Sequence, residues 1–225
     1  MQQQQSQQSQ QSQQSQQQSQ QVAGCGILVI ERGYALCGLT PKSNKYSGIG
    51  GKQIPGETVR TTAFREAVEE LFGVDPSDIM LYALIKRFID NLLIERDNYY
   101  YILLSFADVN VLTAIVNRHI PITPYYKTFP SSIMDLVLNR CPTEAAEITD
   151  LTMTRYAHSS LAVDREFIKD CLKAEHALNE ASKNRLLSRA EADTTKADVE
   201  RPQVSESPVG TSSVAARYTA PPSGP

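Results

Sequence analysis

Three glutamates in the first half of the chain have the residue type and the spacing that divalent-metal chemistry requires. They are Glu66, Glu69 and Glu70. Because a helix advances about 100° per residue, the three carboxylates share one face of any helix that contains them. Mg²⁺ prefers carboxylate oxygens together with water and substrate phosphates. Taken alone, the three residues fit an ordinary solvated acidic face better than a metal site.

The elements around these glutamates are suited to positioning them. Residues 58–72 have a helical pattern, with an apolar stripe on the face opposite the carboxylates. The stripe consists of Val59, Ala63, Ala67 and Leu71. Thr58 is the expected N-cap and Gly73 the expected stop signal. The preceding residues 40–58 contain four glycines and two prolines, which predicts a sharply bent loop.

The segment from Gly51 to Val74 resembles the Nudix box, whose pattern is G-x5-E-x7-R-E-U-x-E-E-x-G-U with U aliphatic. The matching positions are Gly51, Glu57, Arg65, Glu66, Glu69 and Glu70. Two residues, Leu71 and Phe72, precede Gly73 where the family has one, so we expect the helix to end later. Ile49 also stands where the family usually has proline. The resemblance is close over the box. The pattern of strands and helices over about 160 residues is consistent with the family's fold.

The resemblance implies a hydrolase that uses Mg²⁺ or Mn²⁺ to cleave the pyrophosphate bond of a nucleoside diphosphate linked to another moiety. By position, the implied metal ligands are Glu66, Glu69, Glu70 and the carbonyl of Gly51, with Gly50 as an alternative. Glu57 would pair with Arg65 and support the site.

The catalytic residues that the resemblance implies are Arg65, Glu66, Glu69 and Glu147. Glu66 is the first candidate to accept a proton from the attacking water. In the family a glutamate on a later loop can serve instead, and Glu147 or Glu144 is placed for that role.

Contacts to a nucleotide-type substrate are expected from basic loop residues, which could bind phosphates. The candidates are Lys42, Lys45 and Lys52. Tyr99–Tyr101, Tyr125 and Tyr126 could stack on a base, although packing is the commoner role for such residues. The three histidines show no ligand spacing.

The expected fold class is α/β, a Nudix-like α/β/α sandwich with a mixed sheet. A hairpin that turns at Arg32-Gly33 should open the domain. The expected strands are 23–40, as this hairpin, and 79–89, 98–109 and 147–156, with a turn at 94–98. Beyond 58–72, the expected helices are 110–118, 131–139 and 164–187. The apolar stripe of the last helix is Phe167, Ile168, Cys171, Leu172, Leu178 and Ala181.

Composition divides the chain into three parts. Residues 1–21 are almost entirely Gln and Ser and predict a disordered tail, with a self-associating or partner-binding tract as the alternative. Residues 22–190 can form one domain with a core. Residues 191–225, rich in Ser, Thr, Pro and charge, predict a second disordered tail.

Charge and cysteine usage exclude several classes of protein. A net charge of −3 argues against tight, non-specific binding of nucleic acid. Four cysteines without a CxxC pair argue against a structural zinc site or a disulfide framework. No apolar run is long enough to cross a membrane, and the N-terminus lacks a signal-peptide pattern. We therefore expect reduced, mostly buried thiols in an intracellular protein of the cytoplasm, with the nucleus left open.

Three functions remain open. The first is a pyrophosphohydrolase that acts on a small nucleotide-type molecule. The second is an mRNA-decapping enzyme acting on capped RNA, which would need a basic groove leading to the box. The third is a non-catalytic module that binds a nucleotide or a partner. Oligomeric state is not encoded in any of these patterns.

Overall fold

The computed structural model describes residues 24–199. The chain divides into two compact units, one that ends at Ala181 and one that begins at Ser182. The first contains every strand and all but one of the helices in full. The last helix, α6 (Arg165–Val199), continues past residue 191, where the sequence predicts the start of the second tail. The tail predicted at 1–21 lies outside the described residues.

Seven strands form one mixed sheet, in which β1 is the central strand. Their bounds are β1 Gly24–Glu31, β2 Tyr34–Thr40, β3 Lys45–Ser47, β4 Ile49–Gly51, β5 Leu93–Arg96, β6 Tyr99–Leu104 and β7 Asp150–Arg155. β1 pairs in parallel with β6 on one side. On its other side β1 pairs with β4 along its first residues and with β2 at its end. β2 also pairs with β3 and β7, and β5 pairs with β6.

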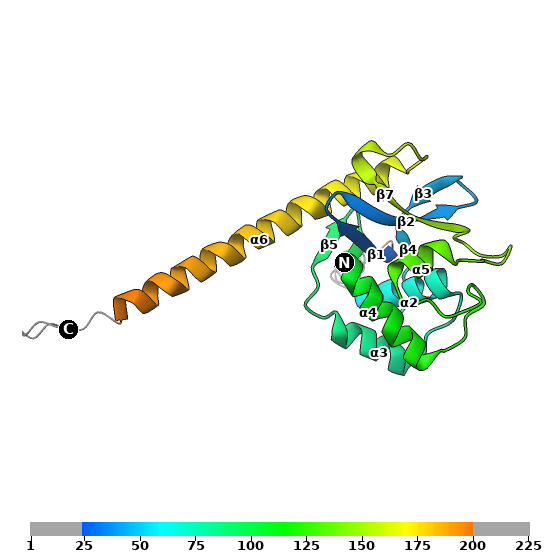
Figure 1. The fold of residues 1–225 in the computed structure, drawn as a ribbon, viewed down its shortest axis with the longest axis horizontal. Helices are drawn as coiled ribbons and strands as arrows, with labels where there is room; N and C mark the ends of the chain where they lie inside the picture. The colour runs from blue at the N-terminus through cyan, green and yellow to red at the C-terminus, as the bar shows by residue number, and fades with distance from the viewer. Residues whose placement is uncertain (1–23, 200–225) are drawn as a thin grey trace, which may run out of the picture. The chain divides into compact units, whose positions relative to one another are not determined.

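Helices cover both faces of this sheet, which confirms the predicted α/β fold class with its mixed sheet. The helices are α2 Val59–Phe72, α3 Asp78–Arg87, α4 Phe106–His119, α5 Ile133–Leu138, α6, and the short 3-10 helix η1 Tyr156–His158. Figure 1 shows α2, α3 and α4 grouped on one side of the strands. The first turns of α6 pack on the other face, where Phe167 and Cys171 are buried.

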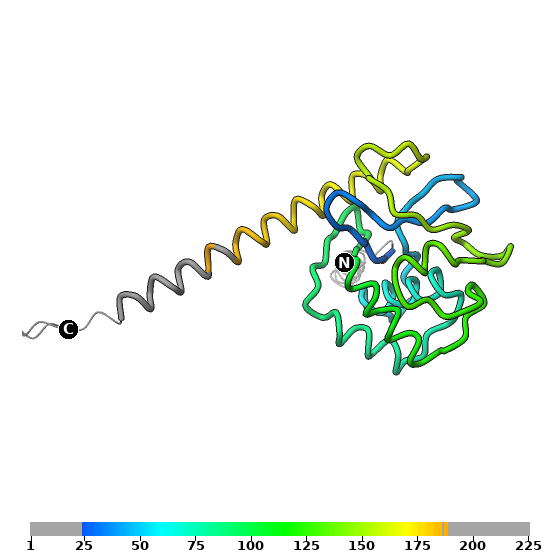
Figure 2. The backbone as a smooth tube through the Cα atoms, viewed as in Figure 1, coloured from blue at the N-terminus to red at the C-terminus, as the bar shows by residue number. Residues whose placement is uncertain are grey.

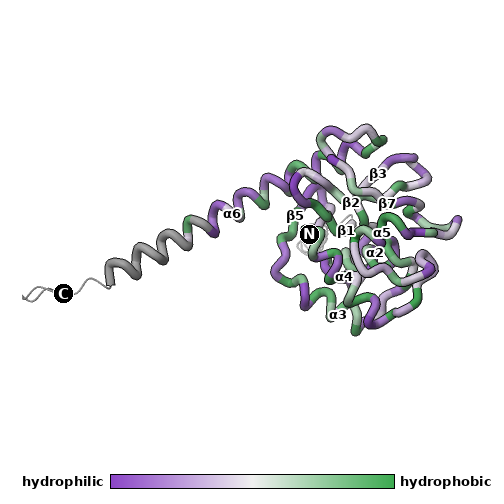
Figure 3. The backbone as a smooth tube through the Cα atoms, in the orientation of Figure 1, coloured by the Kyte–Doolittle hydropathy of each residue, from purple (hydrophilic) through white to green (hydrophobic). Residues whose placement is uncertain are grey.

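Alternating residues of β1 supply the two cores. Cys25, Ile27 and Val29 belong to the larger core beneath α2 and α4, while Leu28 and Ile30 belong to the core beneath α6. This alternation is expected of a strand, whose successive side chains point to opposite faces. Figure 3 shows the hydrophobic colouring concentrated in elements such as β1 and α5.

One predicted strand is wrong: residues 79–89 fold mainly as α3. Ser77 caps this helix by accepting a hydrogen bond from the Met80 amide at 3.4 Å. Leu81, Leu84 and Phe88 are buried in the core at helical spacing. The apolar run is dense enough to suit a strand as well, so periodicity alone does not separate the two structures.

The next two elements also shift relative to the sequence prediction. Most of the turn predicted at 94–98 is instead the strand β5, which ends at Arg96. The turn is Asp97-Asn98, where both residues have positive φ, as two-residue hairpin turns require. β6 ends at Leu104 because Ser105 and Asp108 form a capping box that starts α4.

The remaining predictions agree more closely with the structure. The hairpin of β1 and β2 turns at Arg32-Gly33, both with positive φ. The loop at 40–58 contains the two short strands β3 and β4. The predicted stripe on α6 is partly wrong, because Leu172 and Leu178 are exposed, and Ala174 takes a buried position instead. The side chains of Cys25, Cys37 and Cys171 are buried and Cys141 is exposed, all as free thiols. None of the helices in the described residues is long and apolar enough to cross a bilayer.

Candidate active site

The box begins in β4 and passes through a bent loop into α2, as the backbone trace in Figure 2 follows from blue to cyan. Thr58 caps the helix by accepting a hydrogen bond from the Thr61 amide at 3.1 Å. Gly73 ends the helix with φ 71°, and its amide donates to the Glu69 carbonyl at 2.8 Å. Both predicted boundary residues are thereby confirmed.

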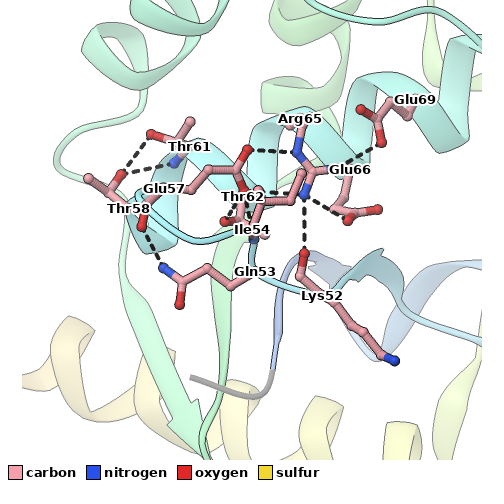
Figure 4. A network of polar contacts seen from close by, with 10 residues as sticks. All are labelled: Lys52, Gln53, Ile54, Glu57, Thr58, Thr61, Thr62, Arg65, Glu66 and Glu69. Carbon is pink, nitrogen blue, oxygen red and sulfur yellow. Dashed lines mark hydrogen bonds and ion pairs between the residues drawn. The ribbon is translucent and has the colours of Figure 1, made fainter. Parts of the chain in front are cut away.

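Arg65 lies at the centre of the polar network in Figure 4. Its Nε donates to Glu57 Oε1 at 2.8 Å, and its terminal nitrogens contact Glu66 and Glu69, each at 2.9 Å. It also donates to the Lys52 carbonyl at 3.1 Å. One guanidinium thus joins the loop to three carboxylates of the box, including the predicted Glu57–Arg65 pair.

Glu57 is fixed as an anion at the start of the helix. Burial alone would raise the pKa of this carboxyl, but hydrogen bonds from Arg65, the Thr62 hydroxyl and the Ile54 amide outweigh it and lower the pKa. Burial also acts to lower the pKa of Arg65, and pairing with the three glutamates raises it overall. The two groups therefore remain charged and hold the loop against α2.

Glu66 and Glu70 reach from α2 to the backbone of β4. A Cβ atom on Gly51 would lie 2.5 Å from the carboxylate oxygens of Glu66, so a side chain at Gly51 would displace that carboxylate. The amide of Gly50 donates to Glu70 Oε2 at 2.7 Å. Both carboxylates therefore pack directly against the backbone of β4.

The carboxylates on the site face hold their protons more tightly than glutamates in water. The pKa of Glu70 is raised to about 8, chiefly by burial and also by the charges of Glu66 and Glu147, while the Gly50 amide and Arg140 act against the rise. Burial also raises the pKa of Glu66 and of Glu69, with Arg65 opposing the rise in each case. Burial thus outweighs the compensation that Arg65 provides at Glu66 and Glu69.

A cavity of about 650 Å³ opens beside these groups. The residues that line it are Lys42, Gly51, Lys52, Glu66, Glu69, Glu70, Gly73, Val74, Asp75, Tyr125, Ala145 and Glu147. Seven of the ten residues predicted for the site belong to this lining. Glu57 and Arg65 are not part of the lining, and their mutual contact supports the start of the helix.

Lys45 and most of the candidate tyrosines lie elsewhere. Lys45 is outside the cavity lining, and its Nζ lies 3.8 Å from Asp164. The Tyr99 and Tyr101 rings pack on each other with centroids 4.6 Å apart. The Tyr126 side chain is buried and donates to the Leu136 carbonyl. Tyr125 is the candidate tyrosine that reaches the cavity.

The carboxylate of Glu147 is exposed and makes no hydrogen bond or ion pair with the rest of the described chain. It enters the cavity from the segment before β7, while Glu144 is not part of the lining. The loop position that the resemblance suggested is therefore better matched by Glu147 than by Glu144.

Phe72, one of the two residues between Glu70 and Gly73, has a definite place in the core. Its ring stacks on Phe129 with centroids 5.4 Å apart and also contacts Tyr126. α2 ends at Phe72, directly before Gly73. A further cation at this end, Arg140, has no signal in the sequence, and its guanidinium donates to the carbonyls of Glu70 and Leu71.

The donor atoms of the site suit a hard divalent cation. Among the described residues, no group of three or more His, Cys, Asp or Glu side chains is arranged to hold a metal ion by itself. Mg²⁺, however, is usually bound through one or two carboxylates, with water and substrate phosphates completing its shell. Half-buried Glu70, neighbouring Glu66 and the Gly51 backbone fit such an incomplete oxygen set.

Comparison with known proteins finds similarity among solved structures. The chain matches no protein-family model. It likewise matches no curated protein. Among solved structures it is similar to a hydrolase of the NUDIX family from Clostridium perfringens, with 13% sequence identity and a TM-score of 0.36. The match covers 70% of this chain and 98% of that chain. A similarity this distant indicates no function by itself.

Proposed function

We propose that this chain is a metal-dependent hydrolase of the Nudix type, which cleaves the pyrophosphate bond of a nucleoside diphosphate linked to another moiety. One observation carries the proposal: four carboxylates and two lysines line the same cavity. The carboxylates are those of Glu66, Glu69, Glu70 and Glu147. Anionic groups that can hold a divalent cation thus lie beside cations that can bind phosphate.

Glu66 and Glu70 are the principal candidates to hold Mg²⁺ or Mn²⁺, with Glu69 and the Gly51 carbonyl as further ligands. When bound, such an ion would neutralise the bridging phosphates and lower the pKa of the attacking water. Arg65 keeps Glu66 and Glu69 oriented through its contacts at 2.9 Å.

Glu147 is the better candidate to accept the proton of that water. Glu66 is held by Arg65, whereas the Glu147 carboxylate is free of other described groups and lines the cavity. Lys42 and Lys52 would bind the phosphates by charge-assisted hydrogen bonds. In Figure 4 the Lys52 ammonium points away from the Arg65 network, so it is available for this role.

The cavity volume supports a nucleotide-sized substrate. Ligand pockets commonly measure about 300–1,000 Å³, and this cavity measures about 650 Å³. Capped RNA presents the same kind of bond at its end and therefore belongs in the substrate panel.

The test is hydrolysis by the purified full-length protein with Mg²⁺ or Mn²⁺. The substrates are nucleotide sugars, ADP-ribose, dinucleoside polyphosphates and cap-labelled RNA. Wild type is compared with Glu70→Gln, which keeps an acceptor for the Gly50 amide, and with Glu144→Gln, whose residue lies outside the cavity lining.

We expect cleavage of one substrate class at the pyrophosphate, a loss of about 10²–10³-fold in Glu70→Gln, and no change in Glu144→Gln. If every substrate binds and none is cleaved at any metal concentration, the hydrolase proposal fails and a nucleotide-binding module replaces it. Cleavage of capped RNA alone would select the decapping function.

A further inference from the structure

The C-terminal end of α2 carries Glu70 and is capped mainly by side chains that are distant in sequence. The last carbonyls of a helix lack partners within the helix and must find them elsewhere. Arg140 Nη2 donates to the Glu70 carbonyl at 2.6 Å, and Arg140 Nη1 donates to the Leu71 carbonyl at 2.7 Å. The Thr123 hydroxyl donates to the Phe72 carbonyl.

The same guanidinium also holds the segment that carries Glu147. Arg140 Nη2 donates to the Ile148 carbonyl at 3.0 Å, and Ile148 directly follows Glu147. The guanidinium carbon lies 4.6 Å from the centroid of the Tyr125 ring, which lines the cavity. A single side chain thus bridges the backbones that carry two of the site's carboxylates.

A guanidinium suits this bridge better than an ammonium. Arg presents several N–H donors in a rigid planar fork, whereas Lys is a flexible point charge. The positive charge also lies at the helix C-terminus, where the helix dipole favours it. Arg140 is not among the residues that line the cavity, so it acts through the main chain and not on the substrate.

We propose that Arg140 is a positioning residue that fixes the separation of the Glu70 and Glu147 carboxylates by holding both backbones on one guanidinium. The roles of those two carboxylates rest on the proposed function. The bridge itself rests on the three hydrogen bonds to the carbonyls of Glu70, Leu71 and Ile148.

The test measures Mn²⁺ binding to the full-length protein by titration calorimetry, without substrate, alongside hydrolysis. Arg140→Lys is compared with Arg60→Lys. Arg60 is a matched control because it also joins α2 to a distant segment through main-chain carbonyls, those of Phe88 at 2.9 Å and Asn91 at 3.1 Å. Neither carbonyl belongs to the cavity lining.

We expect Arg140→Lys to weaken Mn²⁺ binding about 10–100-fold, as for residues that orient metal ligands, and Arg60→Lys to change it less than about twofold. Thermal melts of both variants report any shared loss of stability. Arg140→Gln provides a second variant if the lysine variant does not fold.

A double-mutant cycle with Glu147→Gln separates positioning from general loosening. If Arg140 acts by placing Glu147, the proposed proton acceptor, Arg140→Lys lowers kcat by a smaller factor in the Glu147→Gln background than in wild type. Additive effects on kcat, or wild-type Mn²⁺ affinity in Arg140→Lys, would overturn the inference. A wild type that binds Mn²⁺ but cleaves nothing would instead overturn the proposed function and leave the bridge standing. A wild type that binds no Mn²⁺ overturns both.

Discussion

The charges of the site are unevenly compensated. Arg65 contacts Glu57, Glu66 and Glu69, so one cation serves three carboxylates. Glu70 is more deeply buried, and its carboxylate accepts a hydrogen bond only from the neutral Gly50 amide within the described chain. Arg140 attracts this charge, but within the described chain no cation contacts the carboxylate, so Glu70 is costly to ionise. Glu70 is therefore where an added divalent ion would gain most.

Lys52 and Lys45 allow the phosphate-binding role to be tested with a matched pair. Lys52 lines the cavity, whereas Lys45 lies beside Asp164 outside it. We expect Lys52→Ala to raise KM about tenfold with a smaller change in kcat, because a charge-assisted contact contributes about 1.5–3 kcal/mol. Lys45→Ala should leave both constants unchanged. Steady-state kinetics on the cleaved substrate would check this, and equal effects of the two variants would contradict it.

The box carboxylates can be predicted well from sequence because a helix with fixed spacing brings them together without help from distant segments. Glu147, Lys42 and Lys52 are acidic or basic residues on loops, and the fold brings them to the same cavity. Lys45 is predicted on the same grounds, yet it lies beside Asp164. Arg140 could not be predicted, because its partners are main-chain carbonyls that leave no pattern in the sequence.

Two features of the end of α2 require glycine at position 73: its backbone conformation and the close approach of Tyr125. Its φ of 71° belongs to the left-handed region, and a Cβ atom there would lie 2.7 Å from the Tyr125 ring. Gly33 shares the first demand alone, with φ 80° and open space within 4 Å of where a Cβ atom would lie. Comparing substitutions at the two glycines therefore distinguishes the cost of backbone strain from the cost of a steric clash.

We expect Gly33→Ala to lower the free energy of unfolding by about 1–2 kcal/mol, the cost of a left-handed residue with a side chain. Gly73→Ala should lower it by a further amount of about 1–3 kcal/mol, because Tyr125 must also move. Urea denaturation of both variants measures the difference. If Tyr125→Ala does not reduce the extra cost at Gly73, the steric explanation is wrong.

The elements themselves are predictable in part. The helix at 58–72 is predicted correctly because its cap, stripe and stop signal agree. The strand predicted at 79–89 is wrong, although Ser77, Asp78 and the basic pair Lys86-Arg87 are start and stop signals of a helix. The short strands β3 and β4 could not be predicted. β3 pairs with β2 and β4 with β1, and these pairings depend on the surrounding fold more than on local sequence.

The stability of the whole domain should depend on pH through the site. An unperturbed glutamate has a pKa of 4.5, whereas burial raises that of folded Glu70 to about 8. Between these values the folded state binds more protons than the unfolded state. The stabilisation is therefore complete below about pH 4.5 and is lost as the pH rises through about 8.

In EDTA, we expect the wild-type Tm to fall relative to that of Glu70→Gln as the pH rises from about 5 to about 8.5. The glutamine variant lacks the titrating group and keeps an acceptor for the Gly50 amide. Added Mg²⁺ or Mn²⁺ should raise the wild-type Tm more at about pH 8 than at about pH 5, because metal binding needs deprotonated ligands. Thermal melts across this range test both points, and a Tm difference that is independent of pH would contradict the assignment of Glu70.

Phe72 also limits how this protein can change over evolution. Its ring packs on Phe129, and its carbonyl accepts from Thr123. Deleting it would turn Gly73 by about 100° around the helix axis and shift it about 1.5 Å along it, and Phe129 and Thr123 would lose their partner in the same step. Homologues with the shorter helix should consequently carry a different segment at 123–148, and the two regions should be inherited as a pair.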